Sequence, residues 1–184
     1  MDLTLTITIG ILLGCFIALS WFAGTDAPYV PTKKERIRKI LLEAGVKKGI
    51  IFYELGSGDG RVVIEAAKLR GSAFGIEQSL IRLLLSRFIA FRSNIKNATF
   101  IHGDIFKQDL SHADVVFIFL LPKGIAKLEG KLRRELKKGA IIISQTFHLT
   151  NWKPYKKILV TSKNAPNTTL GKEKLEGDFW LYRV

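Results

Sequence analysis

Short apolar runs alternate with longer amphipathic segments along most of the chain, from Ile50 to the end. This alternation is typical of βαβ units, in which a helix returns the chain to the start of the next parallel strand. Strands are predicted at 50–55, 73–77, 99–104, 114–121 and 140–147, with helices after Gly60, over 80–91 and over 124–138. Two further runs, 155–162 and 178–184, have no long helix between them and are predicted to pair antiparallel. The pattern therefore predicts an α/β protein with a seven-stranded, mostly parallel sheet and an antiparallel closing strand.

A separate amphipathic helix is predicted just ahead of the sheet. Thr32 and Glu35 form a T-x-x-E capping box, apolar positions then recur at helical spacing, and Gly45 supplies a stop. The preceding "DAPYVPT" contains two prolines and is predicted to be an extended linker. The chain thus divides into an N-terminal segment at 1–25, a linker and capping helix at 26–49, and the main domain at 50–184.

The N-terminal segment has no charged residue between Leu3 and Thr25. Its length matches the roughly 20 apolar residues that a bilayer-spanning helix needs, so we predict one transmembrane helix. A cleaved signal peptide is the weaker interpretation, because the only early charge is the acidic Asp2. The basic run "KKERIRK" at 33–39 follows the segment, and the positive-inside rule therefore predicts a single-pass membrane protein whose folded domain lies on the cytoplasmic side.

The net charge of the chain is +13, which favours contact with acidic partners. An anionic lipid surface and a nucleic acid both fit this charge, and a solvated basic surface with no partner fits it equally well. The only cysteine, Cys15, lies in the N-terminal segment, and the three histidines are scattered. We therefore expect no disulfide and no metal site.

The stretch "YELGSGDGRVVIEAA" joins the first strand of the main domain to its first helix through three alternating glycines. Such a turn lets backbone N–H groups approach a ligand. It is not the dinucleotide fingerprint, which would need a glycine at Arg61. Because Glu54 and Asp59 place two carboxylates beside the turn, a cationic ligand is expected rather than a pyrophosphate.

Acidic residues also follow the next two strands. Glu77 ends the second strand, where an acid typically binds ribose hydroxyls, and Asp104 after the third is placed to accept from an adenine amino group. With Glu54 for an ammonium group, these positions fit S-adenosylmethionine. Taken singly, the features also fit a packing bend, a surface acid and a helix cap. The predicted cofactor-binding residues of the main domain are Glu54, Gly56, Ser57, Gly58, Asp59, Gly60, Glu77, Gln78, Asp104 and Ile105.

On "ELGSGDG", "GIEQS" and "GDIF", the chain resembles the class I, seven-β-strand S-adenosylmethionine-dependent methyltransferases over nearly all of 28–184. With the apolar N-terminal segment, "PYVPT" and "FLLPKGIAKLEGKLRRELKKGAIIIS", it is most similar to the small membrane-anchored lysine methyltransferases that modify the ATP synthase c ring protein and the adenine nucleotide translocase. Histone-lysine enzymes of the Dot1 type share its first two motifs. The resemblance implies a Rossmann-like fold and a lid formed by "PYVPT", with Tyr29 and Thr32 near the cofactor. A stiff linker and a helix cap explain the same two residues equally well.

The resulting hypothesis is a protein-lysine N-methyltransferase acting on a membrane or membrane-proximal protein. The open alternatives are methylation of a lipid or small amphiphile and a non-catalytic cofactor-binding membrane protein. A nucleic-acid substrate is not expected, because no aromatic-basic RNA-binding module is present. No catalytic base is assigned, and the nucleophile's side of the site is expected to be lined by Leu121, Pro122, Gln145 and Thr146.

Overall fold

The computed structural model describes residues 2–22, 32–159 and 177–184, the side chains of 16–22 excepted. In this part of the chain, seven strands form one sheet in the order β3-β2-β1-β4-β5-β7-β6. They are β1 (Ile51–Leu55), β2 (Ser72–Glu77), β3 (Ala98–His102), β4 (Val115–Ile118), β5 (Ile141–Gln145), β6 (Lys156–Ile158) and β7 (Phe179–Arg183). The first five pair in parallel, and β7 lies antiparallel between β5 and β6. The predicted α/β class and the antiparallel closure are confirmed.

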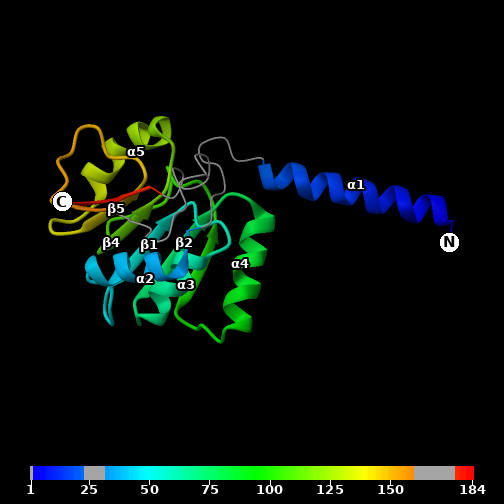
Figure 1. The fold of residues 1–184 in the computed structure, drawn as a ribbon, viewed down its shortest axis with the longest axis horizontal. Helices are drawn as coiled ribbons and strands as arrows, with labels where there is room; N and C mark the ends of the chain where they lie inside the picture. Colours follow the sequence, from blue (N-terminus) through cyan, green and yellow to red (C-terminus); the bar gives the residue numbers. More distant parts are fainter. Residues whose placement is uncertain (1, 23–31, 160–176) are drawn as a thin grey trace, which may run out of the picture.

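Helices cover both faces of this sheet (Figure 1). They are α2 (Lys34–Glu43), α3 (Arg61–Lys68), α4 (Leu80–Arg92) and α5 (Pro122–Glu135). Residues from α2, α3 and α4 share one hydrophobic cluster with Phe52, Phe117 and Ile143 of the sheet, whereas α5 packs with the opposite side chains of the same strands. All four residues of β4 are buried because both of its faces are covered.

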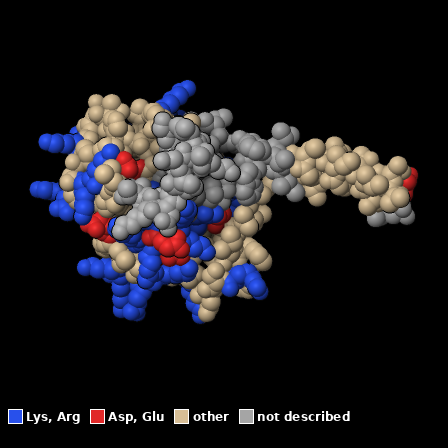
Figure 2. Space-filling view, viewed as in Figure 1, with Lys and Arg blue, Asp and Glu red and all other residues tan. Residues whose placement is uncertain are grey.

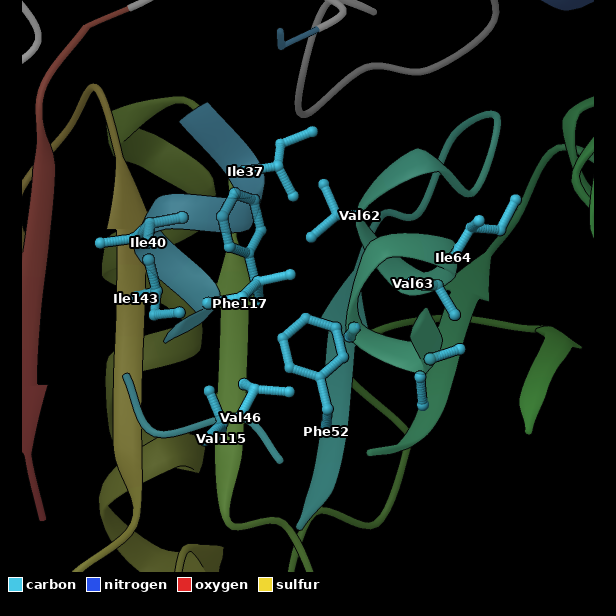
Figure 3. Packing of buried hydrophobic residues seen from close by; sticks show 14 of the residues in the cluster. Ile37, Ile40, Val46, Phe52, Val62, Val63, Ile64, Val115, Phe117 and Ile143 are labelled. Atoms are coloured by element: carbon cyan, nitrogen blue, oxygen red, sulfur yellow. The ribbon is translucent and has the colours of Figure 1, made fainter. Parts of the chain in front are cut away.

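The close packing of the first cluster is visible in Figure 3, where Ile37 and Ile40 of α2 and Val62 of α3 point toward the rings of Phe52 and Phe117. Both rings are at most 1% exposed. Truncating either ring to alanine is expected to cost about 3–5 kcal/mol, because it removes the buried surface and leaves a cavity. This core fixes β1 and β4, whose carboxyl ends carry the residues considered below.

Two predicted helix ends differ from the structure. The capping box is wrong: α2 has Lys33 as its N-cap and no side-chain cap, because the Thr32 hydroxyl donates to Gln145 Oε1 instead, at 2.9 Å. Helix α5 starts at Pro122 rather than at Gly124, since the fixed φ of proline suits the first helical position. The glycine stop after α2 is confirmed, with Gly45 at φ +79°.

The N-terminal segment forms helix α1 (Leu3–Phe22), which extends away from the domain (Figure 1). Over the ranges that the structure describes, no helix combines the length and the apolar character that a membrane span requires. The predicted transmembrane helix is therefore not supported.

Candidate functional site

The candidate site lies at the carboxyl ends of β1, β2 and β4. From β1 the chain continues to β2 on one side of the sheet, whereas β4 pairs with the other side of β1. Such a point, where the strand order reverses, leaves a crevice in which open α/β sheets bind ligands. The glycine turn after β1 and Glu77 at the end of β2 both lie at this edge, as the sequence predicts.

The backbone N–H groups of the glycine turn are mostly engaged within the protein. Gly56 and Ser57 donate to the carbonyl of Ile76 at 2.9 Å, and Gly58 donates to Glu77 Oε2 at 2.8 Å. The expectation that these amides are free to hold a ligand carboxylate is therefore wrong for these three residues. Instead they fasten the turn to the end of β2.

The glycines are needed for shape. Gly56, Gly58 and Gly60 all have positive φ, which other residues adopt only with strain. A Cβ on Gly60 would lie 2.5 Å from the ring of Phe100, so the turn packs directly on the sheet. A Cβ on Gly56 would meet nothing within 4 Å. The turn is thus closed toward the sheet at Gly60 and open at Gly56, where a ligand has room to approach.

Glu54 is the least satisfied acid of the site. It is 6% exposed near the end of β1, and its Oε2 has no hydrogen-bond partner. Burial raises the pKa of its carboxyl well above the ordinary value, and the Asp59 carboxylate raises this pKa further, against an opposing hydrogen bond from the Val63 backbone. A buried carboxyl of this kind lacks a donor or a cation, which is what a ligand ammonium group supplies.

Asp59, the second carboxylate of the turn, is already paired. Its Oδ2 lies 2.6 Å from Arg61 Nη2, and Arg61 Nη1 donates to the Thr32 carbonyl at 3.2 Å. Asp59 therefore orients Arg61, which ties the segment at Thr32 to the start of α3. The role of Arg61 was missed in the sequence, although its position two residues after an acid at a helix start was a usable signal.

Glu77 bridges two neighbouring turns. It is 4% exposed and accepts from Gly58 N and from Ser79 N, both at 2.8 Å. A carboxylate has about four acceptor positions, so two contacts leave capacity for ribose hydroxyls. Arg82 Nε lies 3.5 Å away and keeps this acid paired inside the protein.

The residues after β2 and β3 are more exposed. Gln78 is exposed, and its carbonyl lies 2.9 Å from His102 Nε2. Asp104 is exposed and accepts from the Phe106 N–H at 2.9 Å, so it caps the turn that contains the half-buried Ile105. The cap interpretation of Asp104 is thus confirmed, and an adenine contact for it stays a prediction. Tyr29 lies outside the described residues.

Polar groups also gather at the end of β5. Gln145 is fully buried, accepts from the Thr32 hydroxyl, and leaves its Nε2 without a partner. The next residue, Thr146, has φ +68°, a strained conformation for a β-branched residue. Strain and an unsatisfied buried amide beside the crevice are typical of functional sites. The far side of the crevice is bordered by Leu121 and Pro122, which begin α5.

The residues present fit S-adenosylmethionine on observations of this structure. Glu54 Oε2 and Ser57 Oγ are buried and unpartnered, and the turn is open at Gly56. The first suits the ammonium group of the ligand, and the second suits a neighbouring polar atom. Glu77 has acceptor capacity at the adjacent strand end, where a ribose would lie.

Comparison with known proteins agrees with this geometry. The family model described as "ANTKMT methyltransferase domain" matches residues 54–156, more than half of the chain. The chain is 34% identical over 148 residues to a protein-lysine N-methyltransferase of Saccharolobus islandicus, a match that covers 77% of this chain and 89% of the relative. It is 37% identical over 128 residues to a Xenopus laevis lysine N-methyltransferase named for the C-type subunit of ATP synthase, covering 69% of this chain and 56% of that relative.

Among solved structures, an RNA methyltransferase from Salinibacter ruber in complex with S-adenosyl-L-homocysteine superposes with a TM-score of 0.72 at 30% identity. That match covers 84% of this chain and 93% of the other. The chain spans little more than half the length of the Xenopus laevis relative. The matched region contains the glycine turn, Glu77 and β5, so the site and the family evidence coincide. This chain belongs to the ANTKMT methyltransferase domain family.

Proposed function

We propose that this methyltransferase transfers a methyl group from S-adenosylmethionine to the side-chain nitrogen of a lysine in a protein. The observation that carries the proposal is the 34% identity with the protein-lysine N-methyltransferase of Saccharolobus islandicus, which extends over 89% of that relative. The match is therefore to nearly a whole protein-lysine methyltransferase.

The methyl donor is supported by the unpartnered Glu54 Oε2 beside the open side of the glycine turn. S-adenosylmethionine supplies an activated methyl group on a sulfonium, together with an ammonium group that the buried carboxyl lacks. Binding of that ammonium group would lower the pKa of Glu54 and let it ionise. Glu77 would meanwhile hold the ribose through its remaining acceptor positions.

The chain's contribution to the reaction is alignment and exclusion of water. The lysine nitrogen forms a bond to the methyl carbon as the carbon–sulfur bond breaks, and the electron pair of that bond stays on sulfur. The lysine must first lose a proton, since its ordinary pKa is about 10.4. The apolar start of α5 at Leu121 and Pro122 desolvates the incoming amine, and the ordered backbone at Thr146 positions it.

The proposed acceptor is a membrane or membrane-proximal protein, and the domain would act on the cytoplasmic side. The Xenopus laevis relative is named for a component of ATP synthase. In this chain the described side chains of α1 include exposed leucines and isoleucines at 3, 5, 7, 9, 11, 12 and 13. A helix with this surface would hold the domain close to lipid, and the basic run at 33–39 favours the cytoplasmic face.

The test uses the full chain and a donor with an isotopically labelled methyl group. The purified protein is incubated with a membrane extract, which is then separated into protein, lipid and RNA. Label recovered as N-methylated lysine after hydrolysis of the protein fraction supports the proposal. Label only in organic solvent would instead support a lipid or amphiphile acceptor, and binding of the donor without transfer would support a non-catalytic protein.

RNA is the second candidate acceptor, and one observation favours it. The RNA methyltransferase from Salinibacter ruber is 30% identical to this chain and covers most of it. The net charge of +13 would also attract nucleic acid. Label in the RNA fraction that exceeds label in protein would select this candidate and overturn the first.

A further inference from the structure

Helix α4 carries an exposed apolar face that the methyltransferase site does not use. Leu80, Leu84, Phe88 and Phe91 are 55%, 54%, 60% and 81% exposed. They follow one another at intervals of three or four residues, so they form one stripe along the helix. We call these four residues the α4 stripe. The opposite side of the helix is buried against the sheet through Leu83 and Ala90.

No other helix of the described domain, residues 32–159 and 177–184, has such a surface. Outside α1 and α4, the exposed large apolar side chains in that part of the chain are the dispersed Leu42, Leu121, Tyr155 and Leu159. Scattered apolar residues need no explanation, but a continuous stripe with two phenylalanines usually marks a contact surface.

The charges of α4 indicate what covers the stripe. Helical geometry puts Arg87 and Arg92 on its two flanks, and both are exposed. Lys96, also exposed, follows the helix, and the sequence of α4 contains no acidic residue. A second copy of this chain would bring arginines against arginines. An anionic lipid surface, in contrast, accepts apolar side chains between its headgroups and pairs its phosphates with the flanking arginines.

The position of α1 supports the same occupant. Helix α1 contacts α4 and leaves the domain on the side where α4 lies (Figure 1). Its surface is uncharged apart from the acidic residue near its tip, whereas basic side chains gather over the domain (Figure 2). The apolar surface of α1 is therefore continuous with the α4 stripe, and lipid that takes up one helix meets the other.

We propose that α4 is a membrane-binding surface of the catalytic domain, with the α4 stripe embedded at the surface of an anionic bilayer and Arg87 and Arg92 on its phosphates. This surface acts together with α1 and does not depend on which molecule is methylated. Because Leu80 follows Glu77 closely in sequence, the start of the stripe lies near the carboxyl edge of the sheet. The site is thereby held next to the lipid rather than on a tether.

The test places a fluorophore on the stripe in the full-length protein. The single cysteine is replaced (Cys15→Ser), and Phe88→Cys is labelled with an environment-sensitive dye; Lys138→Cys, exposed beyond α5, is the matched control. The protein is mixed with phosphatidylserine-containing vesicles. The dye at position 88 is expected to shift to shorter wavelength and to be quenched by lipids with spin labels in their acyl chains. The dye at position 138 is expected to do neither.

A second measurement uses the otherwise unaltered chain. The double change Leu84→Gln and Phe88→Gln is expected to weaken partitioning onto the same vesicles about tenfold or more, because two large apolar side chains no longer enter the lipid. Leu42→Gln on α2 removes one equally exposed leucine and should leave partitioning unchanged. Unaltered binding of S-adenosylhomocysteine by the double variant would show that it is folded.

Three results would overturn the proposal. The first is a dye at position 88 that remains water-exposed on vesicles that have bound the protein. The second is equal binding to neutral and anionic vesicles, which would remove the role of the arginines. The third is a wavelength shift at position 88 without vesicles that grows with protein concentration, since this would assign the stripe to a second copy of the chain.

Discussion

Replacing Glu54 by glutamine should stabilise the protein alone and weaken its binding of the methyl donor. Glu54 Oε2 is buried without a partner, and the pKa of this carboxyl is raised by burial and by Asp59. Glutamine has the same shape, keeps an oxygen for the Val63 N–H, and carries no charge to be desolvated. The two effects have opposite signs, so a general disturbance of the fold cannot imitate them.

The stability effect depends on pH in a defined direction. The folded state holds a proton on Glu54 at pH values where the unfolded chain, with an ordinary pKa of 4.5, has released it. Stability of the natural protein therefore falls as pH rises from this value toward the raised folded pKa, and glutamine removes that loss. Leaving a buried polar group unsatisfied costs about 1–3 kcal/mol. At roughly 2–4 °C per kcal/mol for a chain of this size, Tm of Glu54→Gln should be several degrees higher at pH 8 and nearly unchanged at pH 4.

The binding effect is the loss of a charge-assisted hydrogen bond to the ligand ammonium group. Such a bond contributes about 1.5–3 kcal/mol, which corresponds to a roughly tenfold to hundredfold rise in Kd. Calorimetric titration with S-adenosylhomocysteine measures this rise, and thermal unfolding without ligand measures Tm. A variant that is less stable at pH 8 and binds with unchanged Kd would refute the assignment of Glu54.

Three further substitutions test the surroundings of the site. Gly60→Ala should destabilise the protein by about 2–4 kcal/mol in denaturant unfolding, because its Cβ would lie 2.5 Å from Phe100 and its φ is +76°; an unchanged midpoint would contradict the tight packing of the turn. Thr32→Val removes the hydroxyl that donates to Gln145 and should cost about 1–3 kcal/mol, whereas Thr32→Ser should restore most of it. Glu77→Ala should weaken binding of S-adenosylhomocysteine at least tenfold, and an unaltered Kd would remove its role in holding ribose.

Much of the fold was predictable because period and burial are written locally in the sequence. The four buried residues of β4 and the apolar spacing of α4 gave the right elements within a few residues. The order of site residues at the strand ends followed from the parallel sheet alone, since β1 and β2 must both end at the same edge.

Side-chain partners across the chain were not predictable in the same way. The Thr32 hydroxyl had a local acceptor role in the capping box, but its actual partner is Gln145, 113 residues away. The amide of Gly58 looked available to a ligand, yet Glu77 from the next strand reaches it. In both cases the deciding contact depends on how two strand ends approach in space, which hydrophobic periodicity does not specify.

The most direct test of the central claim is calorimetric titration of the full-length protein with S-adenosylhomocysteine and, separately, with NAD and FAD. The carboxylates at the ends of β1 and β2 predict saturable binding of the first ligand with one site per chain, and no heat of binding from either dinucleotide. Binding of a dinucleotide together with indifference to S-adenosylhomocysteine would contradict the assignment of this crevice to a methyl donor.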